Sequence, residues 1–192
     1  MTDLELFSAS IISRSKENND AFECLYEKQL YGNCISILRQ EVDSLIRIFY
    51  LLSYDDIEDR NLFISMTVSG EKWSLINSNG KRQFITDRDM VELTSSHKLF
   101  GWANYVYKFG CSFIHLSRLH NYGIINPFQT LGDNDKKAII SYMNQYHNAG
   151  VNENSSLDDF IPYLPKILEK ISSHVRYYTK EYILTQSVWD KS

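Results

Sequence analysis

The chain has 192 residues, enough to bury a single hydrophobic core without disulfide or metal staples. Hydrophobic residues make up 43% of the sequence and charged residues 23%, which excludes a disordered or low-complexity chain. The formal net charge of −4 argues against non-specific DNA binding, because that mode needs clustered cations. We therefore expect one globular domain spanning residues 1–192.

Cysteine usage and the N-terminal sequence indicate a cytoplasmic protein. Cys24, Cys34 and Cys111 form no CxxC pair and are expected to be reduced core residues. The N-terminus carries Asp3 and Glu5 where a signal peptide would be basic. No apolar run approaches the length of a membrane-spanning helix, so no membrane association is expected.

The first 52 residues predict two antiparallel helices. Residues 3–30 are helical, with a polar centre that is a candidate break, and Gly32 and Asn33 are expected to form the turn. The second helix has apolar residues at alternating spacings of three and four, which keep one face toward a partner. These are Ile35, Leu38, Val42, Leu45, Phe49 and Leu52.

A β-hairpin is expected next, as an insertion over about residues 61–86. Two short runs between residues 72 and 85 flank Asn79-Gly80, a pair that suits a two-residue hairpin turn. In that register Leu75 faces Phe84. Asp89 stands three residues after Thr86, which predicts the cap of a following helix.

That helix is expected to run from Asp87 to Tyr122 as the central element of the fold. One of its faces is apolar and predicts core. It consists of Leu99, Trp102, Val106, Phe109, Phe113 and Leu116. Beside it runs a row of small residues, Ala103, Gly110 and Ser117. Glycine weakens a helix interior, so Gly110 indicates close approach of another backbone.

Two further helices complete the prediction. One begins at Asp133 and ends near His147, and the other begins near Pro165 and ends near Ile183. The expected fold is mainly α, a bundle of roughly five helices with a β-hairpin insertion near residues 72–85.

The opposite face of the central helix carries a polar line. It consists of Asn104, Lys108, Cys111, His115, Arg118 and Tyr122, at alternating spacings of four and three. One interpretation is a solvated face. The other is a cleft for an anionic group, with His115 and Arg118 as candidate catalytic residues and Asn104, Lys108 and Tyr122 as binding residues. His120 continues the apolar stripe and is expected in the core.

Two charged residues flank the stripe of the second helix. Arg39 and Glu41 need partners there, because unpaired charges beside a core are costly. Arg39 is expected to pair with Asp43 one turn away, or alternatively to reach the His115 cleft. Metal and cofactor binding is not expected. His115 and His120 are five residues apart, and two ligands on one helical face need a spacing of four.

The segments Ser36-Ile37-Leu38-Arg39-Gln40-Glu41 and Phe113-Ile114-His115-Leu116-Ser117 resemble HEPN-type helical bundles. This resemblance implies a place in bacterial toxin or defence systems and, for catalytic members, metal-independent RNase activity. Catalytic members carry Arg, then four to six residues, then His. Here Arg118 and His120 are too close, and His115 and Arg118 have the reverse order.

Two functional hypotheses follow. The first is a non-enzymatic interaction or regulatory protein that binds a protein partner or forms a homodimer. The second is an RNase or nucleotide-processing enzyme, with His115 as general acid/base and Arg118, joined by Arg39, stabilising phosphate charge.

Overall fold

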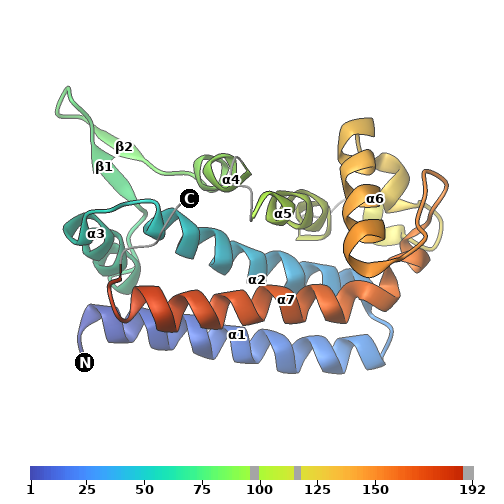
Figure 1. Ribbon diagram of the computed structural model, residues 1–192, viewed down its shortest axis with the longest axis horizontal. Coiled ribbons are helices and arrows are strands. Elements are labelled where there is room, and N and C mark those ends of the chain that lie inside the picture. The colour runs from blue at the N-terminus through green and yellow to red at the C-terminus, as the bar shows by residue number, and fades with distance from the viewer. Residues whose placement is uncertain (96–99, 115–117, 188–192) are drawn as a thin grey trace.

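The protein is mainly α-helical with one small antiparallel sheet, as predicted (Figure 1). The computed structural model describes residues 1–95, 100–114 and 118–187. In chain order its elements are α1 (Asp3–Glu27), α2 (Tyr31–Leu52), α3 (Ile57–Val68), β1 (Ser74–Ile76), β2 (Arg82–Phe84), α4 (Asp87–Ser95), α5 (Gly101–Ile114), α6 (Asp133–His147) and α7 (Leu164–Tyr178). A π-helical turn, Thr179–Ile183, continues α7.

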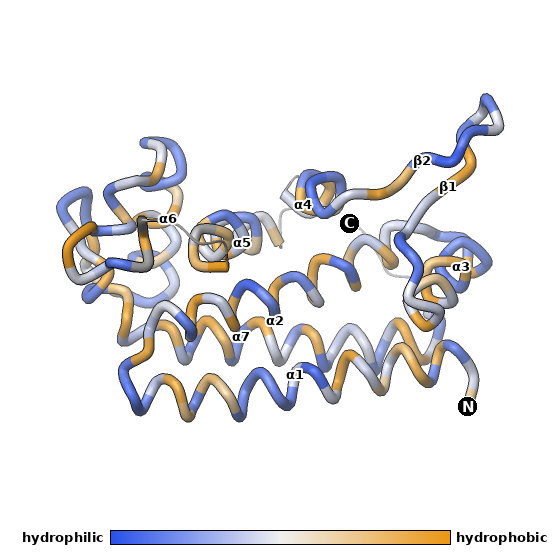
Figure 2. The backbone as a smooth tube through the Cα atoms, turned by 180° about the vertical axis from the view of Figure 1, so that it is seen from behind, coloured by the Kyte–Doolittle hydropathy of each residue, from blue (hydrophilic) through white to orange (hydrophobic). Residues whose placement is uncertain are grey.

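Three long helices, α1, α2 and α7, lie side by side and form the body of the molecule (Figures 1 and 2). Helix α1 starts at a capping box between Thr2 and Glu5 and is continuous through its polar centre. The predicted turn at Gly32 and Asn33 is wrong, because the chain reverses at residues 28–30 and Gln29 takes the positive φ of 58°. Gly32 instead serves packing, since a Cβ there would lie 3.0 Å from the Tyr122 ring.

Helix α2 is the central element, in contact with α1, α4, α5 and α7. All six residues of its predicted stripe are buried, which confirms the core face derived from their spacing. Side chains on both flanks of the stripe are buried as well, including Ile46 and Ile48. A helix packed on several sides needs such a wide apolar surface.

The predicted hairpin is present and projects from the end of the bundle beside α3 (Figure 1). Its register differs by one residue from the prediction, because Leu75 pairs with Gln83 and Ser74 with Phe84. Asn77 pairs with Lys81, so the loop has three residues, and Gly80 takes a positive φ of 71°. This is a turn followed by a glycine bulge, a common three-residue hairpin loop. Helix α3, which precedes the hairpin, was not predicted.

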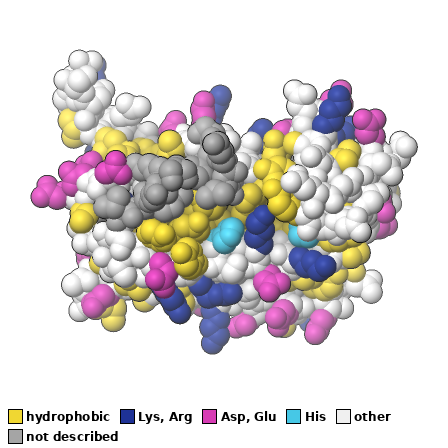
Figure 3. Space-filling model, in the orientation of Figure 1, with side chains coloured by type: hydrophobic (Ala, Val, Ile, Leu, Met, Phe, Trp, Pro, Cys, Tyr) yellow, Lys and Arg dark blue, Asp and Glu magenta, His cyan; other side chains and the backbone are white. Residues whose placement is uncertain are grey.

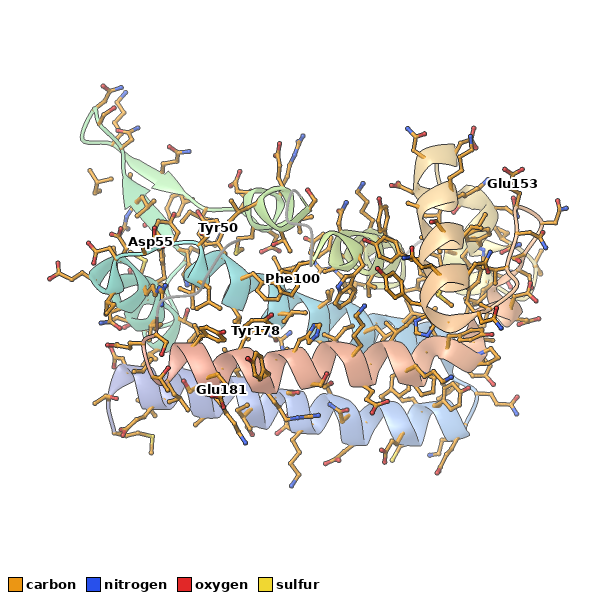
Figure 4. The ribbon with its side chains drawn as sticks, viewed as in Figure 1. Tyr50, Asp55, Phe100, Glu153, Tyr178 and Glu181 are labelled. Carbon is orange, nitrogen blue, oxygen red and sulfur yellow. The ribbon has the colours of Figure 1, made fainter. Side chains whose placement is uncertain are left out.

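The expected single helix from Asp87 to Tyr122 is wrong. Helix α4 ends at Ser95, α5 begins at Gly101, and both cross the long helices (Figure 1). Phe100, just before α5, is buried with its ring centre 3.6 Å from that of Phe49 and 5.5 Å from that of Tyr178 (Figure 4). Phe100, a turn residue outside both helices, thus packs in the core between α2 and α7.

Among the described residues, the buried hydrophobic side chains form two clusters, which we call the main core and the second core. The main core joins α1, α2, α3, α5 and α7. The second core lies around α6 and the segments on either side of it, and consists of Phe128, Met143, Val151 and Phe160. Helix α6 stands across one end of the bundle, so the second core flanks the first (Figure 1).

Candidate functional site

The predicted polar line does not become a single described site. His115 and the side chain of Arg118 lie outside the described residues, so their pairing stays a prediction. Lys108 is half-exposed and its Nζ lies 3.3 Å from Asp135 Oδ1 at the start of α6. Tyr122 follows the end of α5 and packs against Gly32 and Phe113. Asn104 is partly buried. Lys108 and Tyr122 therefore serve contacts with different helices.

Arg39 is a packing residue that joins α2 to α5. Its side chain is buried, and Nη1 lies 3.6 Å from Asp43 Oδ1, which confirms the predicted pair one turn away. Its Nε donates to Cys111 Sγ at 3.3 Å, and its guanidinium carbon lies 3.4 Å from the centre of the Tyr107 ring. The Arg39 side chain thus contacts a carboxylate, a thiol and an aromatic face, and these contacts hold the guanidinium within the fold.

Glu41 belongs to a buried polar contact between α1 and α2. Its side chain is fully buried, and its two carboxylate oxygens accept hydrogen bonds from Ser15 Oγ at 2.5 Å and Asn18 Nδ2 at 2.7 Å. Asn19, next on α1, donates to Ser172 Oγ of α7 at 2.9 Å. A buried carboxylate is tolerated when hydrogen bonds replace its water, so Glu41 fixes helix alignment.

A mostly apolar pocket lies between the two cores, and we call it the inter-core pocket. It has a volume of about 120 Å³ and is partly open to solvent. Its walls come from α5 and α6, with α2 and α7 as the floor. The α5 and α6 walls include Trp102, Val106, Phe109, Ile139, Met143 and Tyr146.

The pocket corrects one part of the prediction made for α5. The stripe containing Trp102, Val106, Phe109 and Phe113 was expected to be core throughout. Trp102 and Phe113 are buried, but Val106 and Phe109 are only partly buried and line the pocket. The spacing of apolar residues identifies the apolar face of a helix, but it does not show whether the facing helices fill all the space against that face.

Basic groups stand at one side of this apolar pocket. Lys170 and His147 line it, and His174 follows Lys170 by one turn on α7. Lys170 Nζ lies 4.4 Å from the centre of the Trp102 ring and 5.2 Å from that of Tyr146. Figure 3 shows histidine and lysine or arginine side chains among hydrophobic ones on this face.

The pocket environment shifts the proton affinities of these groups. Burial lowers the pKa of Lys170. Burial also lowers the pKa of His147 and of His174, and the nearby charge of Lys170 lowers both further. His174 Nδ1 is buried, with no hydrogen-bond partner among the described residues. The pocket thus combines an apolar interior with Lys170 and His147, which form no ion pair within the described part of the chain.

Comparison with known families, curated proteins and solved structures finds no match in any of the three. Within the described ranges, no helix is both long and apolar enough to cross a membrane. The same residues contain no group of three or more His, Cys, Asp or Glu side chains placed to hold a metal ion.

Proposed function

We propose that the protein is a non-enzymatic, cytoplasmic interaction or regulatory protein that binds an apolar ligand in the inter-core pocket. The observation that carries this proposal is the position of the pocket, whose walls come from both cores. An occupant would contact Trp102 on the bundle side and Met143 on the α6 side at once. The bacterial defence or toxin-related setting implied by the HEPN resemblance remains part of this proposal.

The pocket leaves apolar surface of α5 and α6 incompletely packed. Removing such surface from water contributes about 25 cal/mol per Å². Beside the pocket, α6 meets α5 through the Lys108–Asp135 ion pair and the Tyr105 and Tyr142 rings, 5.9 Å apart. A ligand that fills the pocket therefore adds packing between α6 and the bundle, and it can bias how the two are held.

The contacts that Arg39 makes within the fold favour this proposal over the enzyme alternative. In that alternative Arg118 stabilises phosphate charge, and the Arg39 guanidinium joins it beside His115. The Arg39 side chain already contacts Asp43, Cys111 and Tyr107. Releasing it would forfeit a buried ion pair and a stacked aromatic contact.

Binding of N-phenyl-1-naphthylamine, an uncharged apolar probe that fluoresces in apolar surroundings, tests the proposal. We expect saturable binding that weakens by about tenfold or more in Val106→Phe, which fills the pocket from α5. Ile139→Phe, on the α6 wall, should have the same effect. Val68→Phe, at an exposed position on α3, is the matched control and should bind normally.

Two results would overturn the proposal. One is equal probe binding by wild type and both blocked variants, each shown to be folded by circular dichroism. The other is turnover of RNA or nucleotides by the purified protein that disappears in His115→Ala, because that result establishes the enzyme alternative.

A further inference from the structure

Lys170 is a cation placed in an apolar wall. Its Nζ lies over the rings of Trp102 and Tyr146, and none of the ion pairs among the described residues includes it. Aromatic faces offset part of the cost of removing an ammonium from water, but they supply no net negative charge. An ammonium in this position attracts an anion more strongly than one on an open surface.

The groups nearest Lys170 strengthen this preference. His147 faces the pocket from α6, and His174 lies one turn further along α7. The Nδ1 atom of His174 is buried, and none of the residues that the structure describes forms a hydrogen bond with it. Lys166, on the preceding turn of α7, adds a further positive charge close enough to lower the pKa of His147. This side of the pocket thus offers hydrogen-bond donors and positive charge together.

The rest of the pocket sets the chemistry of the remaining part of the ligand. Val106, Ile139 and Met143 offer no hydrogen bonds, so a polar body would lose its water without compensation. A cavity of about 120 Å³ accommodates a short hydrocarbon body rather than a long lipid chain. Lys170 is the one lysine among the described residues that line the pocket, and this favours a head that carries one negative charge.

On the basis of the proposed function, we propose that the inter-core pocket binds a short amphipathic carboxylate. Its hydrocarbon body lies between α5 and α6, and its carboxylate pairs with Lys170. His147, which lines the pocket, provides a second hydrogen-bond donor to the carboxylate. The bound anion supplies the counter-charge that Lys170 lacks in the free protein.

Competition against N-phenyl-1-naphthylamine with three octyl compounds tests the charge preference on the wild-type protein. Octanoate, octanol and octyltrimethylammonium share one hydrocarbon body and differ in head-group charge. We expect octanoate to displace the probe at about tenfold lower concentration than octanol, and octyltrimethylammonium to be the weakest. This comparison needs no variant, so it does not depend on the folding of one.

Substitutions then assign the preference to Lys170. Lys170→Met, which keeps length and apolar volume, should remove the difference between octanoate and octanol. Lys170→Arg should restore most of the difference. Lys180→Met, at an exposed position beyond α7, is the charge-matched control and should behave as wild type.

The outcomes separate this inference from the proposed function. If octanol and the probe bind but octanoate binds no better, the carboxylate assignment is wrong and the pocket proposal stands. If none of the compounds binds, both are wrong. A dimer in light scattering that Val106→Phe dissociates would assign the pocket to a second copy of the chain and overturn the small-molecule ligand.

Discussion

At Gly110, α5 approaches the backbone of α2 very closely. A Cβ at this position would lie 2.5 Å from the Cβ of Arg39, nearer than two such atoms can approach. Arg39 cannot move aside easily, because Asp43 and Tyr107 hold its guanidinium. The close approach that the sequence predicted for Gly110 is confirmed, and the residue it meets is the buried arginine.

We expect Gly110→Ala to lower the free energy of unfolding by about 1–2 kcal/mol. Overpacking costs about 1–3 kcal/mol, and the better helix propensity of alanine offsets up to about 1 kcal/mol. Urea unfolding followed by circular dichroism measures the change. Gly123→Ala is the control, since no atom lies within 4 Å of its would-be Cβ and its φ is not positive. A Gly110→Ala protein as stable as wild type would show that α2 and α5 shift apart freely.

At the scale of elements, the hairpin is attached to the bundle through the residue that precedes its first strand. Trp73 is buried against Phe63 and Tyr50, and its Nε1 donates to Thr67 Oγ1 at 2.7 Å. The strands themselves are largely exposed, with Phe84 53% accessible. An isolated two-stranded hairpin is marginal in water, so this anchor holds it in place.

Truncation of Trp73 should therefore lower the free energy of unfolding far more than truncation of Phe84 in the second strand. We expect Trp73→Ala to lower the free energy of unfolding by about 3–5 kcal/mol, through lost burial and the cavity it leaves. Phe84→Ala, also an aromatic truncation in the hairpin, should change it by less than about 0.5 kcal/mol. Chemical denaturation of both variants checks this pair. Equal losses would mean that the hairpin packs as a unit and that Trp73 has no special role.

Elements with strong local signals were predictable from the sequence, and those that depend on tertiary contacts were not. The stripe of α2 and the cap of α4 at Thr86 and Asp89 are local patterns, and both are present. Phe100, just before α5, packs between Phe49 and Tyr178, residues distant in the sequence, and no local pattern indicates these contacts. The one-residue shift in the hairpin follows from a loop one residue longer than the Asn-Gly pair indicated.

The pocket could not be predicted from the sequence either, because it also depends on contacts between distant segments. Val106 and Lys170 are separated along the chain, and neither carries a motif. Only the placement of α6 against α5 and α7 brings them together around one cavity. The alternating pattern of α5 made its apolar face clear, but the incomplete filling of that face depends on three other helices.

For the whole molecule, the basic groups at the pocket make stability depend on pH. His147 and His174 have pKa values lowered from 6.5, so the folded state binds protons less readily than the unfolded chain. Their contribution to stability is therefore fully present above about pH 6.5 and is lost as the pH falls through the lowered values. We expect the free energy of unfolding to decrease between pH 7.5 and 5.

Urea unfolding at successive pH values measures this slope. The double variant His147→Gln with His174→Gln should flatten it, because the groups that take up protons on unfolding are gone. Asp89 does not add to the slope in this window, since hydrogen bonds from Thr86 lower its pKa below the usual carboxylate range. An unchanged slope in the double variant would contradict the assignment.

The position of α7 has a consequence for how the protein is made. This helix packs against both α1 and α2. The hydrogen bond from Asn19 to Ser172 joins α1 to α7 across 153 positions of the sequence. During synthesis, α1 and α2 leave the ribosome long before α7, so the apolar faces that α7 covers stay exposed to solvent. The buried residues of the second core lie between residues 128 and 160, so they are all synthesised before α7. The growing chain is thus most in need of chaperone protection after α2 emerges and before α7 does.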